Sequence, residues 1–310
     1  MSVNSRKVYL VGVGPGDPRL ITRRAEQLIK QADVILYDRL VNPFIIQLAN
    51  QSVELLNVGK TPYQKQIKQE AINKLLVQYG QTNKNIVRLK GGDPAIFGRV
   101  DEEIAVLEEN HISYEIIPGI TTASAAASYQ SHGLTKRGTA NQITFMTGHI
   151  QQGREEQIKI DALLNGGTIA VYMGLKRLPH LIKEIQAQSK INYDVAIISN
   201  VSLATQQTYK GKVSTIINDI EGINEQSPAL ILIGDIVNNT TTSWFENLSQ
   251  FGKKILIKGT YEKAIEKAWQ YYDEGAWSFV ETEALDKSPT RINFEQGIIQ
   301  NTTFDEIVEI

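Results

Sequence analysis

Short apolar runs alternate along the chain with longer stretches whose apolar residues recur at helical spacing. In the first part, this pattern predicts strands at residues 8–13, 34–37, 53–58, 86–89 and 114–117. It predicts helices between and after them, at 19–31, 42–50, 64–79, 99–109 and 121–130. Nearly continuous apolar strands separated by helices are typical of parallel strands covered on both faces. The first part therefore predicts an α/β fold.

The alternation then repeats. Further strands are predicted at 142–147, 168–173, 194–199 and 229–234, and further helices at 156–164, 176–187 and 214–219. A last strand, helix and strand are predicted at 255–257, 261–273 and 277–281, a unit too small to bury a core alone. We therefore expect an N-terminal α/β domain, a second α/β domain and a small βαβ-like extension, spanning residues 1–136, 137–244 and 245–310.

The composition narrows the class of protein. With 42% hydrophobic and 21% charged residues among 310, the chain has the profile of a soluble globular protein. No apolar run approaches the roughly 20 residues of a membrane span, and no secretory signal pattern opens the chain, so we expect a cytoplasmic protein without membrane contact. The absence of cysteine excludes disulfides and thiolate catalysis, and the four histidines have no metal-ligand spacing, so no metal site is expected.

The net charge of −2 argues against a generally basic nucleic-acid binder, but it is an average over unlike parts. Residues 245–310 contain 7 Lys or Arg and 12 Asp or Glu, whereas residues 1–244 contain 25 and 22. The larger part is therefore mildly basic, which suits an anionic small molecule.

Three loops rich in glycine follow predicted strands, at 12–18, 91–99 and 118–124. In an open parallel sheet, ligands bind beyond the carboxyl ends of the strands, where all three loops would lie. A dinucleotide site is one alternative, but the first loop has G-x-G-x-G spacing, Pro15 lacks an amide hydrogen, and Asp17 would oppose a pyrophosphate. The loops suit an uncharged or cationic ligand better.

Six segments, taken in order, closely resemble the uroporphyrinogen-III C-methyltransferases of the tetrapyrrole methylase superfamily. They are Val11-Gly12-Val13-Gly14-Pro15-Gly16-Asp17-Pro18, Tyr37-Asp38-Arg39-Leu40-Val41, Val58-Gly59-Lys60, Arg88-Leu89-Lys90-Gly91-Gly92-Asp93-Pro94 with Ile96-Phe97-Gly98-Arg99, Pro118-Gly119-Ile120-Thr121, and Thr144-Phe145-Met146-Thr147-Gly148-His149. The resemblance spans about residues 7–245. It implies two successive αβα domains with a cleft between them for S-adenosylmethionine, usually in a homodimer. It also implies methylation of uroporphyrinogen III at C-2 and C-7, through precorrin-1 to precorrin-2, for sirohaem or cobalamin synthesis.

The resemblance also implies roles for single residues. Asp38 and Lys60 match the positions proposed as proton acceptor and donor. The positions that match cofactor contacts are Pro15, Gly91, Gly92, Asp93, Ile96, Thr121, Thr122, Met173, Val201, Pro228 and Ala229. Because uroporphyrinogen carries eight carboxylates, cations at strand ends or in loops on the expected rim are candidates to bind it: Arg39, Lys90, Arg99, Lys136 and Arg137.

Some positions depart from the family pattern. Val100-Asp101 replaces a Gly-Gly pair, Ser131-His132-Gly133 replaces Gly-Ile-Pro, and Val201 replaces a glycine. Alternatives therefore stay open: a related methylase acting on a later corrin precursor, on diphthamide or on ribosomal RNA, a dinucleotide-dependent oxidoreductase, or a non-catalytic binding module. After residue 251, the chain faintly resembles the beginning of uroporphyrinogen-III synthase, but it is too short for that activity.

Overall fold

The computed structural model describes residues 7–59, 69–82, 84–148, 158–220, 228–237, 243–283 and 286–310. The chain divides into two compact units, and each is described here by itself. Unit 1 combines residues 1–121 with 253–310, and unit 2 comprises residues 122–252. Within the described ranges, no helix is both long and apolar enough to cross a membrane.

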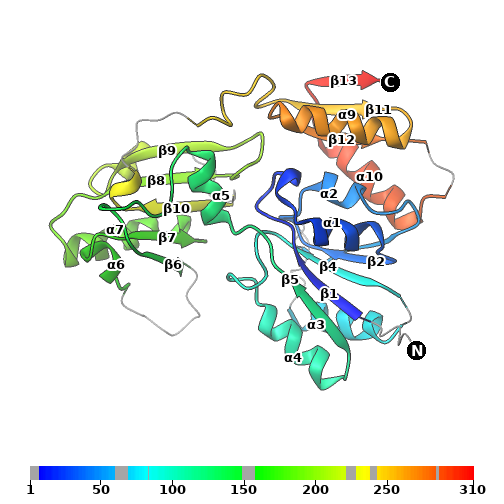
Figure 1. Ribbon diagram of the computed structural model, residues 1–310, viewed down its shortest axis with the longest axis horizontal. Helices are drawn as coiled ribbons and strands as arrows, with labels where there is room; N and C mark the ends of the chain where they lie inside the picture. The colour runs from blue at the N-terminus through cyan, green and yellow to red at the C-terminus, as the bar shows by residue number, and fades with distance from the viewer. Residues whose placement is uncertain are drawn as a thin grey trace. The chain divides into compact units, whose positions relative to one another are not determined.

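Unit 1 is built on a five-stranded parallel sheet with the order β3-β2-β4-β1-β5. Its strands are β1 (Lys7–Gly12), β2 (Val34–Tyr37), β3 (Glu54–Asn57), β4 (Ile86–Lys90) and β5 (Ser113–Ile117). Its helices are α1 (Arg23–Lys30), α2 (Pro43–Gln47), α3 (Gln69–Gly80) and α4 (Val100–Glu109), with a 3₁₀ turn, η1 (Pro18–Leu20). The predicted parallel α/β arrangement is confirmed in this unit (Figure 1).

Alternating side chains along the strands explain the two helical layers. Val8 and Leu10 of β1 pack with α3 and α4, whereas Val11 packs with α1 and α2 on the opposite face. Successive residues of a strand point to opposite faces, so a nearly continuous apolar strand serves both layers.

Unit 2 contains a second five-stranded sheet, with the order β6-β7-β10-β8-β9. Its elements are α5 (Thr122–Tyr129), β6 (Ile143–Thr147), α6 (Asp161–Leu164), β7 (Thr168–Tyr172), η2 (Leu175–Arg177), α7 (Leu178–Gln188), β8 (Asp194–Ser199), β9 (Gln207–Lys212), α8 (Ile216–Asp219), β10 (Ala229–Ile233) and η3 (Asp235–Val237). This sheet is mixed: only β6 and β7 pair in parallel, and β10 is antiparallel to both neighbours. The second sheet therefore differs from the first, because the polar edge strand β9, which the sequence pattern did not predict, forms a hairpin with β8 and reverses the chain before β10.

The C-terminal extension is larger than a single βαβ unit. It consists of β11 (Lys254–Lys258), α9 (Tyr261–Asp273), β12 (Trp277–Glu281), α10 (Pro289–Asn301) and β13 (Glu306–Glu309). Its strands form a parallel sheet with the order β12-β11-β13. The sequence pattern missed α10, in which polar residues dominate, and β13, which has only four residues.

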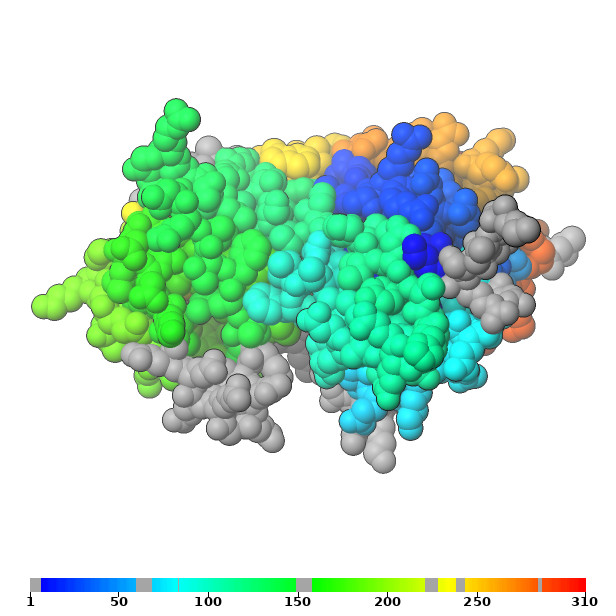
Figure 2. Space-filling view, turned by 60° about the horizontal axis from the view of Figure 1, so that its bottom comes forward, coloured from blue at the N-terminus to red at the C-terminus, as the bar shows by residue number. Residues whose placement is uncertain are grey.

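The extension is part of unit 1. Ala264, Ala268 and Tyr272 of α9 share one hydrophobic core with Phe44 and Ile45 of α2. In Figure 2, the orange extension lies directly against the blue N-terminal segment. The division of the chain thus differs from the expected boundaries: the extension completes the first unit, and α5 belongs to the second.

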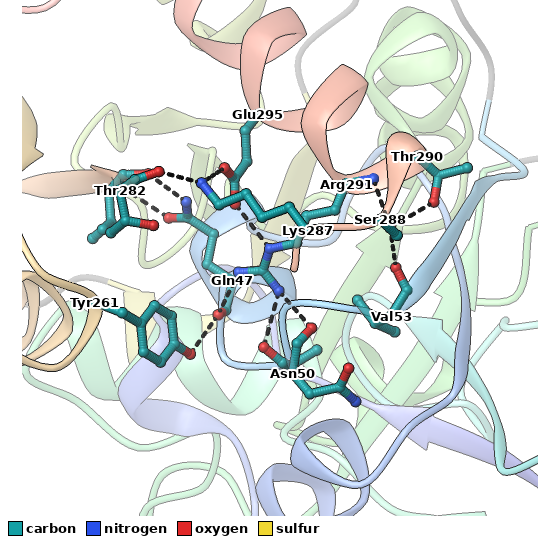
Figure 3. A network of polar contacts seen from close by, with 12 residues as sticks. Gln47, Asn50, Val53, Tyr261, Thr282, Lys287, Ser288, Thr290, Arg291 and Glu295 are labelled. Carbon is teal, nitrogen blue, oxygen red and sulfur yellow. Dashed lines mark hydrogen bonds and ion pairs between the residues drawn. The ribbon is translucent and has the colours of Figure 1, made fainter. Parts of the chain in front are cut away.

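Buried polar contacts join the extension to α2 as well (Figure 3). The Gln47 side chain donates to the Val280 carbonyl at 2.6 Å and accepts from the Val280 amide at 3.0 Å, which satisfies both backbone groups at the outer edge of β12. Arg291, with 2% exposure, donates to the carbonyls of Gln47, Ala49 and Asn50 at 2.9–3.1 Å. The extension therefore caps the end of α2.

Candidate functional site

The three glycine loops meet at the carboxyl end of the first sheet. A methyl group added at Gly12 would lie 2.7 Å from the Gly119 nitrogen and 2.8 Å from the Gly92 oxygen. One added at Gly119 would clash with the Gly92 oxygen. Real side chains do not tolerate such contacts, so these glycines let three backbones approach one another. The structure thus assembles the three predicted loops into one rim.

Backbone hydrogen bonds fix the first loop to the second. Gly14 donates to the Gly92 oxygen at 3.2 Å and Gly92 donates to the Gly14 oxygen at 2.7 Å, which forms an isolated β-bridge. Both residues have positive φ, at 74° and 71°. Pro15, beside this bridge, is half-buried.

Asp93 ties the second loop to the third. Its Oδ1 accepts from the Ala95 amide at 2.7 Å, and its Oδ2 accepts from the Gly119 amide at 3.0 Å. The side chain is only half-buried, and a carboxylate has about four lone-pair sites, so it can accept further bonds from a ligand. Asp17, by contrast, is 2% exposed and paired with Arg19 at 2.6 Å, so it is not directed at a ligand.

Asp38 follows β2 at the same end of the sheet. Its Oδ1 accepts from the Leu40 amide at 3.0 Å, its Oδ2 lies 3.7 Å from Arg88 Nη2, and its side chain is 27% exposed. Lys60 lies outside the described residues. Gly59, just before it, packs on this turn, because a methyl group there would lie 2.5 Å from the Arg39 nitrogen.

Arg88 and Lys90 of β4 are buried cations. Both bond Oε1 of the fully buried Glu103 from α4, Arg88 Nε at 3.3 Å and Lys90 Nζ at 2.9 Å. Burial lowers the pKa of Lys90, and Glu103 opposes this effect. Lys90 was expected to contact substrate from a strand end on the rim; it does end the central strand β4, but its side chain is buried and paired with Glu103.

The two other rim cations of unit 1 are accessible. Arg39 is exposed in the turn after β2. Arg99 is exposed and binds Glu102 through two bonds of 2.7 Å. Phe97 and Arg99 both have φ of 54°, a conformation rare for residues other than glycine, which gives the second loop its sharp bend into α4. Gly91 and Ile96, on the same loop, are half-buried, as is Thr121.

In unit 2, most of the predicted cofactor positions lie at one end of the central strands of the second sheet. Ala229 pairs with Ser199 at the end of β8, and Leu230 pairs with Tyr172 at the end of β7. This pairing brings four of the predicted positions to the same end of these strands: Met173, Val201, Pro228 and Ala229. Tyr172 also accepts from the Ala123 amide at 3.2 Å, which places Thr122, the first residue of α5, nearby.

Met173 is exposed, at 55%, and has φ of 53°, whereas Val201 is 4% exposed. Lys136 and Arg137 are exposed but lie elsewhere. Leu134, just before them, accepts from Thr168 Oγ1 at the start of β7, the end opposite Tyr172. The structure therefore does not bring Lys136 and Arg137 to the end of the strands where Met173 lies.

A family model described as Tetrapyrrole (Corrin/Porphyrin) Methylases matches residues 7–217. The chain belongs to the tetrapyrrole methylase family. The resemblance expected from the six sequence segments is thereby confirmed. The match ends before the C-terminal extension, whose resemblance to uroporphyrinogen-III synthase stays a prediction.

Three similar proteins illustrate this membership. A protein of Priestia megaterium named uroporphyrinogen-III C-methyltransferase is 41% identical over 234 residues, which cover 75% of this chain and 98% of that protein. A protein of Pseudomonas paraeruginosa named siroheme synthase is 40% identical over 242 residues, which cover 77% of this chain and 52% of that protein. A crystal structure of uroporphyrin-III C-methyltransferase from Thermus thermophilus, complexed with S-adenyl homocysteine, is 33% identical with a TM-score of 0.63, covering 74% of this chain and 98% of that one.

Sequence reasoning missed two residues at the site of this tetrapyrrole methylase. Tyr172 was not singled out, although its hydroxyl joins α5 to the second sheet. Glu103 was not singled out either, although it lies between two buried cations. A signal existed, because Arg88 and Lys90 stand two apart on one strand and so share a face, which requires a buried counter-charge.

Proposed function

We propose that the chain is an S-adenosylmethionine-dependent uroporphyrinogen-III C-methyltransferase, which methylates C-2 and C-7 to give precorrin-2 through precorrin-1, for sirohaem or cobalamin synthesis. The observation that carries this proposal is the match over 98% of a protein of that name, together with the assembly of the three matching loops into one rim. The chain spans only about half the length of the siroheme synthase that it matches.

The donor set at the rim fits S-adenosylmethionine. Asp93 is half-buried with spare acceptor capacity, and Pro15 lacks the amide hydrogen that a phosphate cradle would use. These groups favour ribose hydroxyls and a positively charged ligand over a pyrophosphate. When bound, S-adenosylmethionine supplies a methyl group on a cationic sulfur. We assign its contacts to the positions expected from sequence: Pro15, Gly91, Gly92, Asp93, Ile96, Thr121, Thr122, Met173, Val201, Pro228 and Ala229.

Asp38 is the proposed base. Methylation of a pyrrole carbon leaves a proton to be removed from the tetrapyrrole, and Asp38 is a partly exposed carboxylate at the rim. Its bond from the Leu40 amide holds one oxygen in place. Lys60 is the proposed proton donor. Arg39 and Arg99, both exposed, are proposed to bind substrate carboxylates.

The test is the mass of the product. The purified chain is incubated with uroporphyrinogen III and S-adenosylmethionine under reducing, anaerobic conditions, and the tetrapyrrole is analysed by mass spectrometry. We expect a gain of two methyl groups, with a singly methylated intermediate at short times. A chain that binds S-adenosylhomocysteine but leaves uroporphyrinogen unmethylated would be a different methylase or a non-catalytic binding module. Tight NAD binding without S-adenosylhomocysteine binding would favour an oxidoreductase.

Assembly and location are part of the same proposal. We propose a homodimer in the cytoplasm, supported by the family resemblance and by the absence of cysteine. Analytical ultracentrifugation of the full chain decides the oligomeric state, since a monomer at micromolar concentration would contradict it.

A further inference from the structure

Four charged side chains alternate in sign from the rim into the interior of unit 1. Asp38 Oδ2 lies 3.7 Å from Arg88 Nη2, Arg88 Nε lies 3.3 Å from Glu103 Oε1, and Lys90 Nζ lies 2.9 Å from the same oxygen. Only Asp38 has substantial exposure, at 27%, whereas the side chains of Arg88, Glu103 and Lys90 are between 0% and 6% exposed. The cluster is neutral as a whole.

The contacts of Arg88 fix the direction of its guanidinium group. Nε bonds Glu103, and Nη1 donates to the Leu89 carbonyl at 2.7 Å. A planar guanidinium held at two nitrogens has no remaining freedom of rotation, so Nη2 is directed at Asp38. Glu103 therefore determines where Arg88 points, although it does not itself reach Asp38.

Other titratable groups surround the cluster. Tyr37 is the last residue of β2, directly before Asp38. Burial raises the pKa of Tyr37 to about 12, so this tyrosine stays neutral. Arg99 and Glu102 at the start of α4 are exposed and bound to each other. Gln69 of α3 contributes an uncharged amide 3.5 Å from Glu103 Oε1. Lys60 lies outside the described residues. Glu103 is thus the group that offsets the two buried cations of β4.

We propose that Glu103 is a positioning residue for the methyl-transfer reaction. It aims Arg88 at Asp38, and it offsets the charges of Arg88 and Lys90 so that Asp38 keeps enough proton affinity to act as a base. This inference rests on the proposed function, because it assigns a role through the base of that same reaction.

The sign of the effect follows from Coulomb's law. Without the Glu103 charge, the charges of Arg88 and Lys90 are uncompensated and stabilise the carboxylate of Asp38, which weakens it as a base. Without the Lys90 charge, the cluster has an excess negative charge, which has the opposite effect on Asp38. Removing both charges returns the cluster to neutrality.

The experiment is the pH dependence of turnover at saturating substrates. In Glu103→Gln we expect the acidic limb to move to lower pH by on the order of one unit, with a plateau about tenfold lower. In Lys90→Met the limb moves to higher pH, and in the double variant it returns toward the wild-type position. Glu103→Asp keeps the charge, so its limb stays in place even if its rate falls.

Glu109→Gln is the matched control, since Glu109 is an exposed carboxylate further along α4. Melting curves and S-adenosylhomocysteine affinity show whether each variant is folded. Reduced turnover with unmoved limbs in the folded variants would overturn the proposal and leave Glu103 a merely structural residue. If Glu103→Gln does not fold, an unmoved limb in Lys90→Met still overturns it. A wild-type chain without activity refutes the proposed function instead, which separates the two failures.

Discussion

Replacing Arg291 by alanine should detach the C-terminal extension locally. The side chain is 2% exposed and donates to Glu295 and to three carbonyls at the end of α2 (Figure 3). Its removal leaves those carbonyls without their charged donor. Glu295 keeps its partner Lys287 at 2.7 Å, so it is not left alone.

The expected loss follows from these contacts. Removing one partner of a buried ion pair costs about 3–5 kcal/mol, and the remaining Lys287 places this case near the lower end, at about 3 kcal/mol. At about 1.4 kcal/mol for each factor of ten, the opening equilibrium of the extension should rise by roughly 100-fold. The effect should be greatest in α10, which carries Arg291.

Hydrogen–deuterium exchange, read by mass spectrometry of peptides from α10, measures this opening directly. Protection of α10 should fall by roughly 100-fold, whereas peptides of unit 2 should exchange as before. Lys263→Ala is the matched control, because Lys263 is an exposed cation of the same extension. Protection of α10 within threefold of wild type would refute the reasoning that these buried bonds hold the extension in place.

Three further variants test the rim. Gly119→Ala should abolish S-adenosylhomocysteine binding by calorimetry, since the new methyl group would clash with the Gly92 oxygen; normal affinity would show that the loops need not approach so closely. Asp93→Ala should weaken that affinity at least tenfold, because it frees the Gly119 amide and removes a ligand acceptor, and an unchanged dissociation constant would contradict it. Asp38→Asn should lower turnover about 100-fold or more while leaving S-adenosylhomocysteine affinity intact, and undiminished turnover would remove it from the mechanism.

Local patterns predicted the first sheet well, because its strands β1 and β2 are largely apolar on both faces and are followed by recognisable helices. The hairpin of β8 and β9 could not be predicted in the same way. The sequence Gln-Thr-Tyr-Lys-Gly-Lys of β9 is polar, and the strand exists because it pairs along the edge of a sheet, which is a tertiary effect.

The candidate site, too, could be predicted from the sequence only in part. The glycine loops could be located from sequence, since close backbone approach restricts the residue type. The placement of the cations could not. Lys90 and Arg99 both looked like rim residues, but one pairs with a buried carboxylate and the other stays exposed. Whether a lysine or arginine is buried and paired or stays exposed depends on whether its strand is central in the sheet. It also depends on whether another element supplies a partner.

Unit 1 is built from two segments that are far apart in the sequence, and this has a consequence for folding during translation. Residues 264–280 complete the core around Phe44, but the ribosome makes them only after all of unit 2. The apolar surface of α2 therefore stays uncovered on the nascent chain while more than 200 residues are translated, which is when it is open to chaperones or to aggregation. Unit 2 can finish folding first, so this protein reverses the usual order in which the N-terminal part of a chain folds before the rest.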